Sequence, residues 1–201
     1  MLVQDNFDFN QDYVLEDERV ILKPLQNIHA NELAVYVSNE PEIWKYSLVT
    51  INKTEDLQGY INTAIESRKN KTAYPFIVFD KQLNKYVGST RFYDVQLPFE
   101  TTQLGYTWYS NQVWGTGLNA HCKFLLLQFA FEKMQLKRVE FRADNDNKRS
   151  IAAMKKIGCT VEGILRSHLP KPDGTRRDSI VLSITKEEWE QKVKSLLKSQ
   201  L

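Results

Sequence analysis

The sequence is poor in the features that mark secreted, membrane-spanning or metal-binding proteins. Its two cysteines, Cys122 and Cys159, lie in apolar periodic segments without disulfide or metal-ligand spacing, as expected of buried free thiols in a reducing compartment. No apolar run is long enough to span a bilayer. Residues 1–12 are rich in Asn, Asp and Gln and lack the apolar stretch of a secretory signal. We therefore expect a soluble, cytoplasmic protein.

A strong charge of either sign is also lacking. The 27 basic and 25 acidic residues give a formal net charge of +2, which offers no general attraction for nucleic acid. Three basic pairs, Lys148-Arg149, Lys155-Lys156 and Arg176-Arg177, leave a local nucleic-acid surface as a less favoured alternative. The 201 residues contain no low-complexity linker or internal repeat and suit one substantial core. We expect an N-terminal tail at 1–14 and a single domain at 15–201.

The most informative stretch is the loop at 112–119, where Gly115 and Gly117 are separated by one residue. It follows an alternating, strand-like segment at 104–109 and precedes a long apolar, helix-like segment at 118–134. Glycines at such a junction allow several backbone N–H groups to point at one anion. The loop is therefore a candidate phosphate cradle. No Gly-Lys-Ser/Thr follows, which excludes a triphosphate P-loop, and the third glycine of a dinucleotide fold is lacking.

Hydrophobic periodicity predicts further strands and helices along the chain. Helix starts are expected at Asn52, in a capping box with Glu55, at Asn147, and at Thr185 with Glu188. The expected strands are 19–24, 74–80, 86–95, 101–109, 138–144, 159–169 and 179–184, and helices are expected at 29–38, at 118–134 and after each of the three caps.

From about Leu15 to Trp189 these patterns resemble the GNAT superfamily of acyl-CoA-dependent N-acyltransferases, and within it the branch that contains the bacterial ribosomal-protein alanine N-acetyltransferases. The pyrophosphate loop of that superfamily reads Gln/Arg-x-x-Gly-x-Gly/Ala. Gln112, Gly115 and Gly117 satisfy it literally. A second alignment, on Trp114, Gly117 and Asn119, fits the length of the following helix better and is preferred.

A second match to this branch lies around the predicted helix start at Asn147. The branch carries Asp-x-x-Asn-x-x-Ser, a helix that ends in Gly, and then Glu-Gly, which reads here as Asp144, Asn147, Ser150, Gly158 and Glu162-Gly163. By this resemblance Asn147 contacts the pantetheine arm, and Ser150 lies near the thioester sulfur as a candidate general acid. Both residues also suit an ordinary helix start, and the two roles are compatible.

The resemblance implies an α+β (α/β) fold, with a mixed, mostly antiparallel central sheet that splays in the middle and carries helices on both faces. It implies acetyl-CoA as co-substrate and no metal, since His121 has no second His or carboxylate at ligand spacing. A monomer or homodimer is expected, without membrane or nucleic-acid partners. The residues expected to bind CoA are Thr107, Trp108, Tyr109, Trp114, Gly115, Thr116, Gly117, Leu118, Asn119, Asn147 and Ser150.

The expected reaction moves an acetyl group from acetyl-CoA to a primary amine by direct attack in a ternary complex. Cys122 and Cys159 have no paired His in the sequence and make poor nucleophiles. The general base stays open between Glu162, His168 and Glu100. The acceptor is either a protein N-terminus or a small-molecule amine. The alternative is a non-catalytic acyl-CoA-binding regulatory module.

Several other side chains carry competing interpretations. Lys123 lies on the face of its helix that reaches toward the phosphate loop, but a solvated or snorkelling side chain is the favoured interpretation. Trp44, Tyr46 and Tyr60 either line an acceptor pocket or, as favoured, belong to the core. Gly105, inside a predicted strand, indicates a bulge or a close backbone approach.

Overall fold

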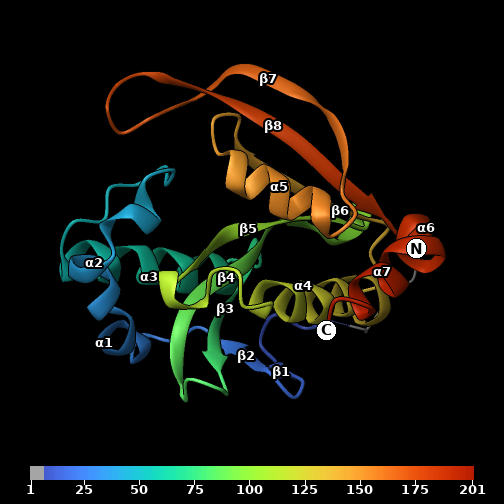
Figure 1. Ribbon diagram of the computed structural model, residues 1–201, viewed down its shortest axis with the longest axis horizontal. Coiled ribbons are helices and arrows are strands. Elements are labelled where there is room, and N and C mark those ends of the chain that lie inside the picture. Colours follow the sequence, from blue (N-terminus) through green and yellow to red (C-terminus); the bar gives the residue numbers. More distant parts are fainter. Residues whose placement is uncertain (1–6) are drawn as a thin grey trace.

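One sheet organises the fold of residues 7–201, which are the residues that the computed structural model describes (Figure 1). Within this range eight strands pair in the order β1-β2-β3-β4-β5-β6-β8-β7. All neighbours are antiparallel except β5 and β6, which run parallel. The predicted α+β fold with a mixed, mostly antiparallel sheet is confirmed. The strands are β1 Leu15–Glu16, β2 Val20–Pro24, β3 Ala73–Asp80, β4 Lys85–Gln96, β5 Thr101–Tyr109, β6 Arg138–Asp144, β7 Thr160–Pro170 and β8 Arg176–Thr185.

Helices cover both faces of the sheet, as predicted. Phe76 and Val78 of β3 face the larger hydrophobic core while Ile77 faces a smaller one, because successive strand side chains point to opposite faces. The smaller core is closed by α1 His29–Leu33, α2 Val35–Asn39, the 3₁₀ turn η1 Pro41–Trp44 and α3 Thr54–Lys69. The larger core is closed by α4 Leu118–Gln128 with its π-helical end η4 Phe129–Lys133, by α5 Lys148–Lys156, and by the C-terminal run of α6 Lys186–Glu188, η5 Trp189–Val193 and α7 Lys194–Lys198.

No helix in residues 7–201 is both long and apolar enough to cross a membrane. The remaining short 3₁₀ turns, η2 Leu97–Phe99 and η3 Asn111–Val113, flank β5.

The N-terminal segment contributes to the larger core. Phe7 and Phe9 are buried and their rings meet edge to face at 4.9 Å. The Tyr13 N–H donates to the Tyr74 hydroxyl at 2.9 Å. Residues 1–6 of the expected tail lie outside the described residues. Of its remaining residues, 7–14, Phe7 and Phe9 are buried in the larger core.

The helix start expected at Asn52 lies one residue further along. Lys53 is the N-cap of α3, and its N–H donates to Asp56 Oδ2 at 3.2 Å. The capping box predicted from Asn52 and Glu55 is therefore wrong by one position, because Asp56 supplies the same carboxylate contact in the shifted register. The box at Thr185 is confirmed.

The parallel pair of strands, β5 and β6, opens after three residue pairs. Thr101, Thr102 and Gln103 are opposite residues 138–140 of β6. Beyond them β5 continues along β4 and β6 continues along β8, so the facing edges of 104–109 and 141–144 have no strand partner among the described residues. We call this V-shaped opening the splay. The resemblance predicted it, and its wide end is where α4 and α5 begin.

Candidate active site

In the loop at 112–119, at the wide end of the splay, several backbone N–H groups have no hydrogen-bond acceptor among the described residues. Gly115 and Gly117 adopt φ angles of 77° and 90°, and α4 begins at Leu118, directly after Gly117. The N–H groups of Gly115, Gly117, Leu118 and Asn119 have no acceptor within residues 7–201. Because the first N–H groups of a helix also carry its positive dipole end, this geometry suits an anion.

Arg149 of α5 reaches this loop from across the splay. Its Cζ lies 3.5 Å from the centroid of the Trp114 ring, and the Trp114 indole N–H donates to the Tyr109 carbonyl at 3.0 Å. The stacked guanidinium adds a positive charge close to the free N–H groups. The sequence indicated Arg149 only as half of a basic pair. Since Arg149 is engaged here and Arg177 is only 7% exposed, the three basic pairs do not form one free basic surface.

Asn147 and Ser150 form the helix cap that the sequence predicted. The Ser150 N–H donates to Asn147 Oδ1 at 3.1 Å at the start of α5, and Gly158 follows the helix with φ 96°. Ser150 is half-buried, and its hydroxyl forms no hydrogen bond within the described part of the chain. That hydroxyl is therefore available to a ligand.

The end of β5 offers mainly its backbone to the splay. Trp108 is buried in the smaller core, with its ring 4.7 Å from that of Trp44. Tyr109 is buried in the larger core. Among the residues expected to bind CoA, these two and Leu118, which is fully buried in the larger core, have side chains that point into the protein, so only their main-chain groups are available.

Lys123 is buried, and the interpretation of a solvated side chain is wrong. It is 5% exposed, and its Nζ donates to Thr107 Oγ1 at 3.1 Å. Burial lowers the pKa of this amine from 10.5 to about 8. The physical reason is its place on α4: Leu126 and Leu127 follow at three and four positions and are fully buried, so all three share the face that packs on the sheet.

The two cysteines are buried free thiols, as predicted. Burial raises the pKa of Cys122 and of Cys159 to about 12. A thiol of such high pKa is a poor nucleophile at neutral pH, which agrees with direct attack by the acceptor.

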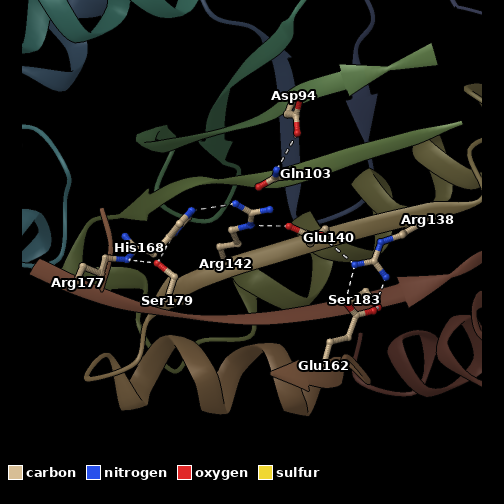
Figure 2. A network of polar contacts seen from close by, with 10 residues as sticks. All are labelled: Asp94, Gln103, Arg138, Glu140, Arg142, Glu162, His168, Arg177, Ser179 and Ser183. Carbon is tan, nitrogen blue, oxygen red and sulfur yellow. Dashed lines mark hydrogen bonds and ion pairs between the residues drawn. The ribbon is translucent and has the colours of Figure 1, made fainter. Parts of the chain in front are cut away.

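A network of polar and charged side chains lies on the face of the splayed strands that points away from the larger core (Figure 2). Val139, Phe141 and Ala143 of β6 face the larger core, so the residues that alternate with them face away from it. Glu140 accepts hydrogen bonds from Arg138 Nη2 at 2.9 Å and from Arg142 Nε at 2.6 Å. The network continues onto β7 and β8 through Glu162, His168, Arg177, Ser179 and Ser183.

Glu162 has structural contacts in place of a base-like setting, and Glu100 lies at the closed end of the splay. Glu162 binds the Arg138 guanidinium and accepts from Ser183 Oγ at 2.6 Å. The Arg138 hydrogen bond, followed by that of Ser183, holds the pKa of this carboxyl below its usual 4.5. Glu100 has φ 54°, and its carbonyl accepts the Lys137 N–H at 2.7 Å at the closed end of the splay.

His168 is the base candidate whose neutral form is favoured. Its Nδ1 is 3.0 Å from Ser179 Oγ, and its Nε2 is 3.5 Å from Arg142 Nη1. Burial, and then the positive charges of Arg142 and Arg177, lower its pKa below 6.5. A neutral imidazole at pH 7 can accept a proton.

The aromatic residues named for the acceptor pocket separate into two groups. Trp44 is buried in the smaller core, and the Tyr46 hydroxyl donates to the Asp146 carbonyl at 3.3 Å. Tyr60 lines a cavity of about 220 Å³ between α3 and strands β4 and β5. Trp44 therefore belongs to the core, Tyr60 lines a cavity, and Tyr46 contacts the turn before α5.

Gly105 lies at the bulge that was one of its two predicted interpretations, and it packs against a side chain. Arg91 is opposite Gly105 and Ser89 is opposite Trp108, so β5 carries one extra residue there, a β-bulge. A Cβ on Gly105 would lie 2.9 Å from Tyr93 Cε1. The tight packing and the bulge occur at the same point of β5.

His121 has carboxylate neighbours that the sequence did not reveal. Its Nδ1 lies 2.8 Å from Asp17 Oδ2 and 3.8 Å from Glu18 Oε1. The interpretation that His121 lacks an acidic neighbour is wrong, because the fold brings together residues 104 positions apart. The contact ties α4 to the turn between β1 and β2.

A splayed mixed sheet, with an anion cradle at the start of the helix that follows β5, is the architecture of an acyl-CoA-dependent acyltransferase. The family model described as "Acetyltransferase (GNAT) domain" matches residues 19–160, which is more than half of the chain. The chain belongs to the GNAT acetyltransferase family.

Relatives of known sequence agree with this assignment, and a solved structure shares the fold. The uncharacterized N-acetyltransferase p20 of Bacillus licheniformis is 26% identical over 180 residues, covering 87% of this chain and 97% of that protein. YdaF of Bacillus subtilis, a candidate ribosomal N-acetyltransferase, is 35% identical over 89 residues, 44% of this chain and 47% of its own. RimJ of Mycobacterium smegmatis, solved with CoA-disulfide, has a TM-score of 0.79 at 20% identity and covers 94% of this chain and 93% of its own.

Proposed function

We propose that this chain transfers an acetyl group from acetyl-CoA to a primary amine by direct attack in a ternary complex. The observation that carries the proposal is the splay, whose wide end holds four unoccupied N–H groups from Gly115 to Asn119. The family assignment supports acetyl transfer, and RimJ was solved with a CoA compound in place. No resident metal or redox group is needed for this reaction.

The residues present fit the co-substrate. The free N–H groups of the loop and the Arg149 guanidinium suit a diphosphate. The start of α4 directly after Gly117 supports the alignment on Trp114, Gly117 and Asn119. The unpaired edge of β5, including the main chain of 107–109, suits the amide groups of pantetheine, with Asn147 on the other side of the splay.

The proposed reaction forms one C–N bond and breaks one C–S bond. The neutral amine attacks the thioester carbonyl carbon, the tetrahedral intermediate expels the thiolate, and the amine nitrogen loses a proton. The Ser150 hydroxyl, which has no hydrogen-bond partner within residues 7–201, is proposed to give its proton to the thiolate and to regain one from solvent, which receives the proton that the amine loses. An α-amino group with a pKa of about 8 needs only a weak base or a water chain, and His168 is the residue best suited to accept that proton.

The acceptor is proposed to be a protein N-terminus or a small-molecule amine. The partial match to YdaF favours a protein N-terminus. The regulatory alternative, an acyl-CoA-binding module without turnover, shares the loop and the splay and differs only in lacking the transfer step.

Calorimetry with acetyl-CoA and with acetyl-pantetheine, followed by thiol release with α-amino peptides and small amines, tests the proposal. Acetyl-pantetheine lacks the diphosphate, so we expect it to bind at least about 100-fold more weakly. Equal affinities would contradict the phosphate role of the loop. Thiol release with one acceptor class supports the enzyme, binding without release supports the regulatory module, and no binding rejects both.

A further inference from the structure

Arg91 occupies an unusual position on the face of the sheet that carries the polar network. Its side chain is 5% exposed and lines the 220 Å³ cavity between α3, β4 and β5. The guanidinium contacts two aromatic rings, with its Cζ 4.7 Å from the centroid of Tyr60 and 4.1 Å from that of Tyr106. These cation–π contacts do not use the N–H donors of the group, which stay available to other partners.

The Arg91 donors lack acceptors. Within residues 7–201 the guanidinium forms no hydrogen bond and has no carboxylate within 4 Å, and its Nη2 is buried without a partner. A buried cation is normally paired, because an unpaired one loses its hydration without compensation. The Arg91 guanidinium is therefore available to an anion that the described chain does not supply.

The surroundings of the cavity favour a negative ligand. Arg177 is 7% exposed, also lacks a carboxylate within 4 Å in the described range, and donates through Nε to Ser179 Oγ at 2.9 Å. One carboxylate, Asp94, lines the cavity, and it already accepts from Gln103 Nε2 at 2.9 Å and Gln96 Nε2 at 3.0 Å. Arg91 and Arg177 are therefore two arginines of this region without a carboxylate within 4 Å among the described residues, while Asp94 contributes one negative charge to the cavity lining.

The cavity lies next to the proposed reaction centre. Tyr106 and Thr107 together oppose Thr90 at the bulge of β5, and Tyr106 has φ 49°. Tyr106 lines the cavity, while the Thr107 hydroxyl contacts Lys123 of α4. The cavity and the splay, where acetyl-CoA is proposed to bind, are thus separated by the bulge in β5. A molecule held at Arg91 can present a nearby amine to the splay.

We propose that Arg91 binds a carboxylate of the acceptor, so that the preferred acceptors are amines that carry a carboxylate close to the amino group. This inference rests on the proposed transferase function and names the chemical class of its acceptor. Two sources share that chemistry: an acidic side chain next to a protein N-terminus, and the α-carboxylate of a free amino acid. The size of the cavity suits a single carboxylate-bearing group and not a large one.

Matched acceptors test the inference. Thiol release is measured with a peptide carrying Glu at its second position against the same peptide with Gln, and with glutamate against its diamide. We expect kcat/KM to be about 10- to 100-fold higher for the charged member of one pair, since hydrogen bonds to charged groups are the stronger ones. The pair that shows the preference identifies the source. Equal rates within both pairs would overturn the inference.

Variants assign the preference to Arg91. In Arg91→Gln the preference disappears through a higher KM, Arg91→Lys keeps part of it, and the affinity for acetyl-CoA is unchanged. Arg166→Gln, at an exposed arginine of β7, is the matched control and keeps the full preference. A preference that survives intact in a folded Arg91→Gln protein contradicts the assignment.

A measurement on the wild-type protein covers the case in which Arg91→Gln does not fold or no acceptor turns over. Binding of glutarate and of glutaramide to the acetyl-CoA-loaded protein is compared by ligand-observed NMR. Glutarate is expected to bind at least about tenfold more tightly, and equal binding overturns the inference. If the protein does not bind acetyl-CoA, the transferase proposal is rejected. The binding of glutarate and of glutaramide is then compared on the protein without acetyl-CoA.

Discussion

The Lys123 ammonium donates a hydrogen bond to the Thr107 hydroxyl at 3.1 Å, in the part of β5 that has separated from β6. Thr107 Oγ1 is also 2.7 Å from Thr90 Oγ1. The only hydrogen-bond partner of the Lys123 amine within residues 7–201 is therefore a neutral hydroxyl, that of Thr107. A charge is therefore held beneath the splay without a carboxylate. Such a charge destabilises the folded protein unless a ligand makes use of it.

Replacing Lys123 with Met is expected to stabilise the protein in a pH-dependent way. Below about pH 8 the folded and unfolded states both carry the proton, and only the folded state bears the cost of burying the charge. From about pH 8 to 10.5 the folded protein loses its proton first, so the stability of the wild type rises with pH. The advantage of Lys123→Met, about 3 kcal/mol at pH 7, should therefore vanish by pH 10.5.

Urea unfolding of both proteins between pH 7 and 10 measures this difference. Lys155→Met, at an exposed position of α5, is the matched control and should show no comparable trend. A stability difference that is the same at every pH would show that Lys123 does not titrate as its burial requires.

Arg149 is expected to contribute to acetyl-CoA affinity through its charge beside the loop. Arg149→Gln should weaken binding about tenfold and lower its dependence on salt, because a stacked guanidinium near a diphosphate is lost. Lys155→Gln, on the last turn of the same helix, removes an equal charge at the opposite end of α5 from Arg149 and should leave affinity nearly unchanged. Titration calorimetry at two salt concentrations compares them, and equal losses in both variants would indicate only a general charge effect.

The parts of the site that follow from local pattern were predictable from the sequence. Gly115 and Gly117 mark the turn into α4, and Asn147 caps α5, because both features depend on residues within a few positions of each other. The splay itself came from the family resemblance. The composition and periodicity alone predicted the strands but not where two of them separate.

Contacts between distant segments could not be predicted. His121 and Asp17 are 104 positions apart, and the rings that stack on Arg91 come from α3 and β5. Lys123 looked solvated because a lysine on a helix is usually exposed, and only the packing of α4 on the sheet shows otherwise. In each case the position is decided by tertiary packing, which the local pattern does not contain.

Glu162 is expected to stabilise the fold and not to act as the base. Its pKa is lowered by Arg138 and Ser183, so its contribution is present above about pH 4.5 and is lost as the pH falls through the lower folded value. Glu162→Gln should keep kcat close to that of the wild type and lower Tm slightly at pH 7, with the difference fading in acid. Glu55→Gln, at an exposed carboxylate, is the control. A large fall in kcat at unchanged Tm would instead make Glu162 a participant in the chemistry.

Ser150 provides the most direct test of the proposed transfer step. Its N–H caps α5 through Asn147, and this contact does not depend on its side chain. Ser150→Ala should therefore keep Tm and acetyl-CoA affinity while lowering kcat by about 10²-fold, as expected for loss of a general acid, and Ser150→Thr should restore part of the rate. Asn147→Ala removes the cap and should cost about 1 kcal/mol of stability. Steady-state kinetics and thermal unfolding separate the roles, since a Ser150 that acts only through its backbone N–H would keep both Tm and kcat in Ser150→Ala.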